Sequence, residues 1–175
     1  MKLAKVVIVG KDEAGKSTLV QNIVPGAINI ERHGRTIALD YGNREHLGYK
    51  LHLFGTPGQA RFRIVRDVVA RGMDVAVWVL DYSRHFDDRD KEILKFLSES
   101  KVPFLVFANI KPGVQKERRR VTRLIGEPEG LKAIVVGSAK SGFRVAELLD
   151  EIVNILESKN GSNNANRLED KCSDN

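Results

Sequence analysis

Residues 10–17 read Gly-Lys-Asp-Glu-Ala-Gly-Lys-Ser, which is the pattern G-x-x-x-x-G-K-S. An apolar run at residues 3–9 precedes this stretch, and a helical pattern over residues 15–23 follows it. In that context the glycines let backbone N–H groups turn around phosphate oxygens, and the helix N-terminus adds positive potential. The stretch therefore predicts a phosphate-binding loop for a nucleoside triphosphate. The alternative is a chance glycine-rich turn before a helix.

The side chains of this loop have different expected roles. Lys16 would supply a positive charge to the β- and γ-phosphates, and the Ser17 hydroxyl is a ligand for Mg²⁺. The carboxylates of Asp12 and Glu13 would repel a triphosphate, so either both point to solvent or one of them tunes Mg²⁺ or an external activator. The candidate nucleotide-binding residues here are Gly10, Asp12, Glu13, Ala14, Gly15, Lys16, Ser17 and Thr18.

Apolar runs alternate with helical patterns along the chain. Strands are predicted at residues 3–9, 36–41, 49–54, 74–80, 104–108 and 133–136, and helices at 15–23, 61–71, 89–100, 115–125 and 145–156. Most of the runs are rich in Val, Ile, Leu and Phe, as strands covered on both faces should be, whereas the second and third are expected to form an edge hairpin. The alternation predicts an α/β fold with a mainly parallel six-stranded sheet, helices on both faces, and ligands at the carboxyl ends of the strands.

Composition fits one globular domain followed by a polar tail. Of the 175 residues, 29 are Lys or Arg and 23 are Asp or Glu, a net charge of +6 that permits an anionic partner. The longest apolar run, residues 75–80, is far shorter than the ~18 residues of a membrane span, so no integral span is expected. Residues 159–175 are expected to form a flexible polar tail after a domain over residues 1–158. The single Cys172 fits a reducing, cytoplasmic location.

Over residues 1–158 the chain resembles the small Ras-like GTPases. The acidic Asp12 is similar to the Arf-type phosphate loop, in which that place is also acidic. Residues 55–62, Gly-Thr-Pro-Gly-Gln-Ala-Arg-Phe, are similar to a segment of the prokaryotic gliding-motility (MglA) and Rup-type members. The resemblance implies a P-loop NTPase G domain that binds GTP and GDP with Mg²⁺ and hydrolyses GTP slowly.

The resemblance also implies two nucleotide-sensing segments. Thr36, 19 residues after Ser17, matches the switch I Thr that binds Mg²⁺ and senses the γ-phosphate, unless it only initiates a strand. Gly58 and Gln59 match switch II, where the glycine N–H contacts the γ-phosphate and the Gln orients the attacking water. A polar turn residue is the alternative for Gln59. The implied catalytic residues are Gln59, Lys16 and Thr36, and the implied metal ligands are Ser17 and Thr36.

One metal-site residue of the family is missing. The family has an Asp three residues before the switch II glycine, where it holds a water on Mg²⁺, but this chain has Gly55. Asp40 and Asp81 are the candidates to replace that carboxylate, and the sequence does not rank them.

Base recognition matches the family only in part. The family pattern Asn-Lys-x-Asp falls on residues 109–112, where Asn109 alone agrees. Ile110 cannot present an ammonium, and Pro112 cannot accept the base protons that mark guanine. Lys111 is the candidate to stack on the base one position late.

A second base-binding loop follows the sixth predicted strand. Ser138, Ala139 and Lys140 match the family's Ser-Ala-Lys loop. The resemblance implies that the Ala139 N–H binds guanine O6 and that Lys140 packs near the base. An ordinary helix cap is the alternative.

The implied partners are a guanine nucleotide and a regulatory or effector protein at the switch regions, by analogy one of the Roadblock type. The basic face with Lys116, Arg118–Arg120 and Arg123 is read as a solvated helix surface, and a site for acidic lipid or nucleic acid is the alternative. Since no aromatic residue interleaves with this face, nucleic acid is not expected as a partner. Three other functions stay open. The basic face would suit a nucleic-acid binder. Gly55 and Pro112 would suit a nucleotide-binding pseudo-GTPase, and Pro112 would suit a P-loop protein that prefers ATP.

Overall fold

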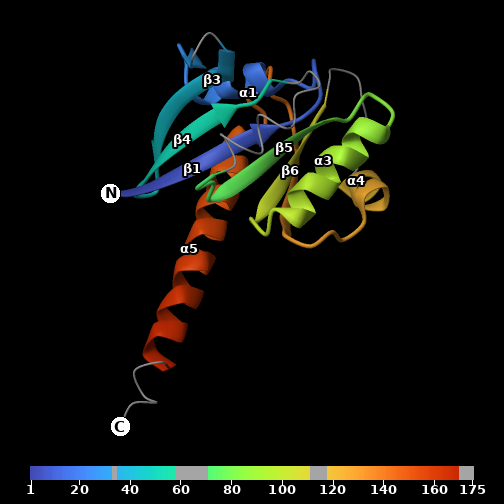
Figure 1. The fold of residues 1–175 in the computed structure, drawn as a ribbon. Coiled ribbons are helices and arrows are strands. Elements are labelled where there is room, and N and C mark those ends of the chain that lie inside the picture. Colours follow the sequence, from blue (N-terminus) through green and yellow to red (C-terminus); the bar gives the residue numbers. More distant parts are fainter. Residues whose placement is uncertain (33–34, 58–70, 111–117, 170–175) are drawn as a thin grey trace.

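The computed structural model describes residues 1–32, 35–57, 71–110 and 118–169, with backbone alone for 29–32, 35–39, 118, 160 and 162–169. In this part of the chain seven strands form one sheet and four helices flank it (Figure 1). The strands are β1 Lys2–Val9, β2 Ile28–Arg32, β3 Arg35–His46, β4 Tyr49–Gly55, β5 Val75–Asp81, β6 Phe104–Asn109 and β7 Leu131–Gly137. The helices are α1 Lys16–Ile23, α3 Asp88–Glu99, α4 Arg118–Ile125 and α5 Val145–Glu169.

The strand order is β2-β3-β4-β1-β5-β6-β7. The five strands from β4 to β7 in this order are parallel, whereas β3 is antiparallel to β4 and β2 is antiparallel to β3. The predicted mainly parallel α/β sheet is confirmed. The strand count is corrected from six to seven, because β2 pairs with β3 and takes the edge. A five-residue strand is too short for its own alternation to stand out, and its pairing depends on β3.

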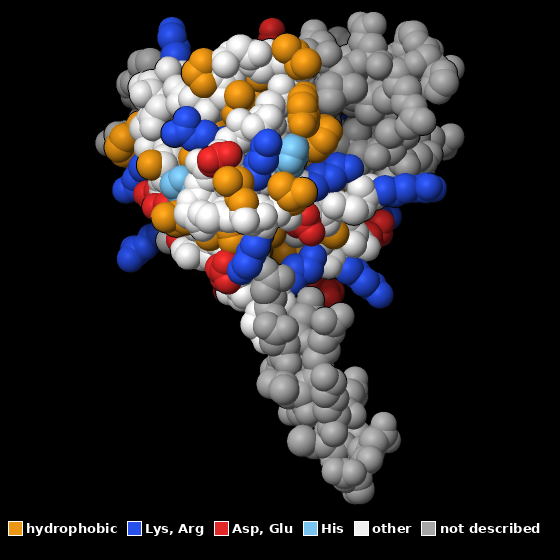
Figure 2. All heavy atoms as spheres, turned by 90° about the vertical axis from the view of Figure 1, so that its left-hand side faces the viewer, with side chains coloured by type: hydrophobic (Ala, Val, Ile, Leu, Met, Phe, Trp, Pro, Cys, Tyr) orange, Lys and Arg blue, Asp and Glu red, His pale blue; other side chains and the backbone are white. Residues whose placement is uncertain are grey.

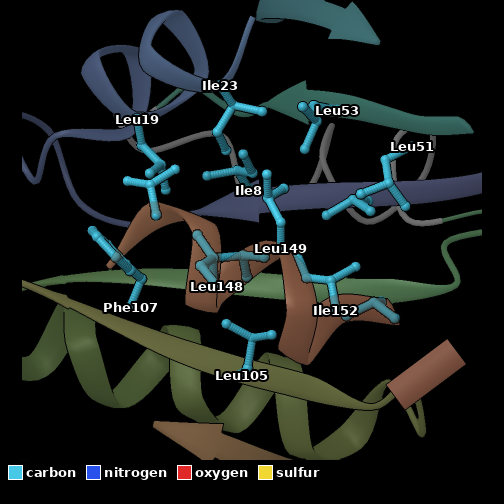
Figure 3. Close-up of a cluster of buried hydrophobic side chains, with 14 of the residues drawn as sticks. Ile8, Leu19, Ile23, Leu51, Leu53, Leu105, Phe107, Leu148, Leu149 and Ile152 are labelled. Atoms are coloured by element: carbon cyan, nitrogen blue, oxygen red, sulfur yellow. The ribbon is translucent and has the colours of Figure 1, made fainter. Parts of the chain in front are cut away.

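Each face of the sheet carries a core. On one face, α1 and α5 bury their apolar stripes against alternate residues of β1, β4 and β6 (Figure 3). The side chains labelled there are Ile8, Leu19, Ile23, Leu51, Leu53, Leu105, Phe107, Leu148, Leu149 and Ile152. On the other face, α3 and α4 cover β5 and β6 with a second cluster. At about 1.5–3 kcal/mol for each fully buried large apolar side chain, these two cores are the main source of stability.

Helix α5 is longer than the sequence pattern predicts. Its predicted stripe, from Val145 to Leu156, is buried against the sheet. The helix then continues to Glu169 and extends away from the sheet, where a flexible tail was expected (Figure 1). Adding residues to an existing helix costs far less than starting one, so the anchored stripe supports helical backbone beyond it. The domain boundary at residue 158 stays a prediction.

Strands β3 and β4 form a tight hairpin. Leu47 and Gly48 make the two-residue turn, and both have positive φ, as turns that match the twist of the strands require. This turn sets a register in which Asp40 lies opposite Gly55. The register brings a carboxylate to the carboxyl end of β4.

The only tryptophan of the chain lies in the sheet. Trp78 of β5 is fully buried, and its ring centroid is 6.2 Å from that of Phe86. Its indole Nε1 has no hydrogen-bond partner among the described residues. Trp78 therefore packs into the core beside the connection from β5 to α3 and leaves one donor unpaired among the described residues.

The surface near the start of β1 mixes charge with apolar side chains. Met1, Leu3 and Leu47 are exposed there. Figure 2 shows Lys and Arg side chains spread over this face between hydrophobic ones, so the positive charge is not gathered into one patch on it. No helix in the described ranges is both long and apolar enough to cross a membrane.

Candidate functional site

The carboxyl ends of five parallel strands meet at one edge of the sheet. The residues there include Gly10 after β1, Thr56 after β4, Asn109 at the end of β6 and Ser138 after β7. Thr56 closes the β4 end onto β1, since its Oγ1 and its N–H donate to the Ile8 carbonyl at 2.9 and 3.0 Å. This edge is where ligands of open α/β sheets bind, and it carries the predicted phosphate loop.

Two glycines give the loop its path. Gly10 has φ +156°, and a Cβ on it would lie 2.5 Å from the Val79 carbonyl oxygen. Gly15 has φ +104°, and a Cβ on it would collide with the amide nitrogen of Asn109. Larger residues would push the loop away from both strands. The glycines of the pattern are thus needed for close backbone approach, as predicted for a loop that surrounds phosphate.

Lys16 is folded back over the loop. Its Nζ donates to the Gly10 carbonyl at 2.9 Å and to the Lys11 carbonyl at 2.5 Å. The side chain is buried, and this desolvation lowers the pKa of Lys16 to about 8, against the opposing charges of Asp12 and Asp40. Two carbonyl oxygens therefore hold this ammonium within the loop. Phosphate oxygens could replace these carbonyl oxygens as its hydrogen-bond acceptors.

Helix α1 starts at Lys16 without a side-chain cap. Its N-cap is Gly15, which provides no side-chain hydrogen bond to the N–H groups of the first turn. Ser17 and Thr18 lie in the first turn and are exposed, whereas Ala14, within the loop, is buried. An uncapped helix N-terminus next to a lysine is a favourable place for an anion.

Glu13 has a specific partner. Its Oε2 accepts a hydrogen bond at 2.7 Å from Nη2 of Arg84, whose Nε lies 3.3 Å from Asp81 Oδ2. The sequence leaves two alternatives for Asp12 and Glu13, exposure to solvent or a role at Mg²⁺ or with an activator. In the structure Glu13 is exposed and also forms an ion pair with Arg84. Asp81 is buried and also accepts from the N–H and Oγ of Ser83 at 2.9 and 2.5 Å. Asp81 is therefore already engaged by its own connection to α3.

Asp40 lies on the other side of the loop. It is buried at the end of β3, and a Cβ on Gly55 would lie 3.3 Å from its Oδ2. Its charge is felt by Lys16, whose pKa it raises against the effect of burial. Among the described residues no hydrogen bond or ion pair engages its carboxylate. The geometry thus favours Asp40 over Asp81 as the carboxylate beside Gly55.

Lys11 was not among the predicted site residues. Its side chain turns away from the loop into the protein, where Nζ contacts Asp90 Oδ2 at 2.6 Å and Asp87 Oδ2 at 3.0 Å. The backbone carbonyl of His85 lies 3.4 Å from the same nitrogen. The spacing of Asp87 and Asp90 before an apolar run signals a helix start, but no local pattern announces a partner in residue 11.

Asn109 joins the phosphate loop to the second predicted base-binding loop. Its Nδ2 donates to the Ala14 carbonyl at 2.9 Å, and its Oδ1 accepts from the Ala139 N–H at 2.9 Å. The Ala139 N–H, expected on guanine O6, is thus bonded to Asn109 in this structure. Ser138 closes its loop by donating its N–H to the Phe143 carbonyl at 3.0 Å, and Lys140 is exposed.

Ile110 stands at the position of the family's lysine, but its side chain is apolar and is buried in the core. It is buried in the cluster under α3 and α4, and its N–H donates to the Gly137 carbonyl at 2.8 Å. Its side chain is therefore part of the core. The basic helix α4 has a partner of its own, since the Arg120 guanidinium lies 4.9 Å from the ring centroid of Tyr82.

Some predicted residues are not placed. Gly58, Gln59 and Lys111 lie outside the described residues, as do residues 61–70 of the helix predicted at 61–71. Thr36 is described by its backbone alone, which lies in β3 and pairs with Glu31 of β2, within the strand predicted at residues 36–41. In the described residues no three His, Cys, Asp or Glu side chains gather as a metal cage.

Known proteins match this arrangement. The family model for 50S ribosome-binding GTPases matches residues 5–110. An uncharacterized protein of Methanocaldococcus jannaschii is 40% identical over 105 residues, which are 60% of this chain and 68% of that protein. GTPase Der of Lactobacillus acidophilus is 29% identical over 164 residues, 88% of this chain but only 37% of that protein. The chain thus spans well under half of its Der relative.

Solved structures share the fold. Era from Aquifex aeolicus, bound to GDP.AlF4-, has a TM-score of 0.69 and 25% identity over 89% of this chain and 57% of its own. The G domain of the T. maritima FeoB iron transporter has a TM-score of 0.68 and 23% identity over 87% of this chain and 98% of its own. With the family model covering more than half of its length, the chain belongs to the 50S ribosome-binding GTPase family and is a GTP-binding P-loop G domain.

Proposed function

We propose that this protein is a molecular switch that binds GTP and GDP in turn and hydrolyses GTP slowly. Its switch segments would differ in conformation between the two states, and a partner protein would bind only one of them. The observation that carries the proposal is the double hydrogen bond of Asn109, which links the phosphate loop at Ala14 to the base-binding loop at Ala139. One side chain thereby couples the two ends of a nucleotide site. Lys140, which is exposed, lies in the second of these loops, one residue after Ala139.

Mg²⁺ suits the oxygen donors of this edge. The ion prefers hard oxygen ligands and keeps several waters, so it needs few carboxylates. Ser17 at the start of α1 and Thr36 would hold it directly, and Asp40 would hold one of its waters in place of a carboxylate at residue 55. When bound, Mg²⁺ neutralises charge on the β- and γ-phosphates. The buried Asp40 carboxylate beside Gly55 supports this assignment.

Hydrolysis is assigned to Gln59 with help from Lys16. Gln59 would orient the attacking water, the Gly58 N–H would contact the γ-phosphate, and the Lys16 ammonium would leave its two carbonyl partners for phosphate oxygens. Without a partner-supplied cation, turnover by this arrangement is slow. Slow turnover is what a switch needs, because each state must outlast its encounter with a partner.

We also propose a finer placement in the prokaryotic branch of MglA and Rup type, supported by residues 55–62, with an Arf-like phosphate loop at Asp12. A partner protein would bind the switch segments in one nucleotide state only. A purified Roadblock-type protein, mixed with the GTP-analogue and GDP forms and compared by size-exclusion chromatography, tests this. Equal binding to both forms would remove the switch part of the proposal.

The decisive experiment is nucleotide binding and turnover. Fluorescent GDP should bind the wild type, Lys16→Ala should lose most of that affinity, and Lys95→Ala, an exposed lysine of α3, should not. Phosphate release over many turnovers should stop in Gln59→Leu. Unchanged affinity in Lys16→Ala contradicts the assignment, and release that persists in Gln59→Leu removes that residue's role.

A second candidate, preference for ATP, has one observation in its favour. The side chain of Ile110 is buried in the core and so does not replace the base-stacking lysine of the family, while Pro112 cannot accept the base protons that mark guanine. Competition of fluorescent GDP by unlabelled GTP and ATP at equal Mg²⁺ decides. Stronger displacement by ATP would favour this candidate, and stronger displacement by GTP the switch.

A further inference from the structure

The phosphate loop is bound to helix α3 by a buried charge cluster. The Lys11 ammonium has three oxygen partners, one on each of Asp90, Asp87 and His85, at 2.6, 3.0 and 3.4 Å. The side chain of Lys11 is 9% exposed and that of Asp90 is 1% exposed. A lysine has three N–H donors, and each has a partner here. This cluster is more than a surface contact.

The same carboxylates also start the helix. Asp87 Oδ1 accepts from the N–H groups of Arg89 and Asp90 at 3.0 and 3.2 Å, and Asp90 Oδ2 accepts from the Asp87 N–H at 3.1 Å. This is a complete capping box, so both carboxylates are held in place before Lys11 reaches them. Burial raises the pKa of Asp90, and the Lys11 ammonium offsets part of that effect. The helix end is therefore a rigid socket for Lys11.

The anchored residue touches the centre of the nucleotide site through its backbone. The Lys11 carbonyl accepts the Lys16 ammonium at 2.5 Å, so residue 11 is bound at its side chain by α3 and at its carbonyl by Lys16. If the socket loosens, the carbonyl moves, and the position of Lys16 and the loop N–H groups moves with it. The effect on phosphate would be indirect, because Lys11 itself points away from the loop.

We propose that Lys11 and Asp90 are positioning residues, which fix the phosphate loop to helix α3 and thereby slow the release of bound nucleotide. The inference rests on the proposed function, since it concerns the same loop. Lys11 is the first variable position of the pattern G-x-x-x-x-G-K-S. The proposed role of its side chain is to attach the loop to α3, not to contact the nucleotide.

The test measures the dissociation rate of a fluorescent GDP analogue from the full chain. Lys11→Met and Asp90→Asn should each speed dissociation about fivefold or more, as expected when one side of a coupled network is removed. Lys91→Met and Asp88→Asn break an exposed ion pair of 2.8 Å in the same first turn and should leave the rate unchanged. A wild-type rate in both Lys11→Met and Asp90→Asn overturns the inference.

A second variant separates positioning from stability. Lys11→Met combined with Asp90→Asn leaves no buried charge and keeps a side-chain oxygen that can accept from the Asp87 N–H, so its thermal midpoint should recover toward that of the wild type. Its GDP dissociation should stay fast, because the anchor is still missing. If dissociation returns to the wild-type rate along with the midpoint, the cluster acts on stability alone and the inference is wrong.

A third measurement covers the failure of the proposed function itself. If the wild type binds no fluorescent GDP, the switch proposal falls, and amide hydrogen exchange of residues 10–16 in the nucleotide-free protein tests the anchor. Faster exchange there in Asp90→Asn, but not in Asp88→Asn, supports it. Equal protection in both variants overturns it.

Discussion

Asp40 Oδ2 lies 3.3 Å from the point that a Cβ on Gly55 would occupy, and the two residues face each other in the β3–β4 hairpin. Strand β3 thus supplies a carboxylate, Asp40, beside the end of β4, where β4 itself has Gly55. A glycine at residue 55 is what makes room for it. A larger residue at position 55 would therefore crowd the Asp40 carboxylate.

The Asp40→Asn variant should bind Mg²⁺ about 10- to 100-fold more weakly in the presence of nucleotide, because an amide holds a metal-bound water less well than a carboxylate. The measurement is the Mg²⁺ dependence of nucleotide dissociation. Asp81→Asn is the matched control, since that carboxylate is engaged by Ser83 and Arg84. A larger shift in Asp81→Asn than in Asp40→Asn would reverse the ranking.

The Asn109→Ala variant should both destabilise the protein and weaken nucleotide binding. It leaves the Ala14 carbonyl and the Ala139 N–H without their partner, at about 1–3 kcal/mol for each buried group that stays unpaired. Thermal unfolding and fluorescent GDP titration check the two effects. Asn43→Ala, at an exposed site on β3, should change neither; loss of stability without loss of affinity would limit Asn109 to a structural role.

Nucleotide affinity should fall as pH rises above 8. Burial lowers the pKa of Lys16 from 10.5 to about 8, and a bound triphosphate would favour the charged form and raise it again. Binding above that pH therefore takes up a proton. The stability of the nucleotide-free protein has the opposite pH dependence. Lys16 makes its free energy of unfolding rise with pH between about 8 and 10.5, because in that range the unfolded chain holds the proton and the folded chain does not.

Titration calorimetry in buffers of different ionisation enthalpy measures this uptake directly. The heat of binding should vary with the buffer above pH 8 and much less below it. Heats that do not depend on the buffer at any pH would show that Lys16 keeps its proton in the free protein.

The Ile152→Ala variant should lose about 2–5 kcal/mol of unfolding free energy, because the fully buried side chain of Ile152 joins α5 to the sheet core. Urea denaturation measures it. Asn154→Ala, two residues on and exposed, should stay within about 0.5 kcal/mol of the wild type. Removal of residues 159–175 should also have little effect if the domain ends at residue 158; a large loss would move that boundary.

The core of the fold follows from local pattern. The first strand, the glycine-rich turn and the following helix are adjacent in sequence, and each has its own signal. The alternation of apolar runs with helical stripes then determines a parallel sheet, and a parallel sheet determines which edge holds the ligand. For this reason the sequence alone predicts that the phosphate loop, Asn109 and residues 138–140 lie at one edge of the sheet.

What the pattern missed depends on distant pairing. Strand β2 is too short to stand out, and it forms because β3 is there to pair with it. Asp40 and Asp81 look alike in sequence, and only the hairpin register separates them. Lys11 meets Asp90 across 79 positions of chain, which no periodicity within one element can reveal. The extension of α5 is helical in spite of its polar composition.

Trp78 gives the protein a built-in optical probe. The indole of this single tryptophan is shielded from water, so its emission should be blue-shifted in the folded state and should move to the red on unfolding. Since the ring lies near Phe86, just before the carboxylates that hold Lys11, we expect its intensity to report any change in that connection on nucleotide binding. Folding and ligand binding can thus be followed in unlabelled protein, with no change to the chain.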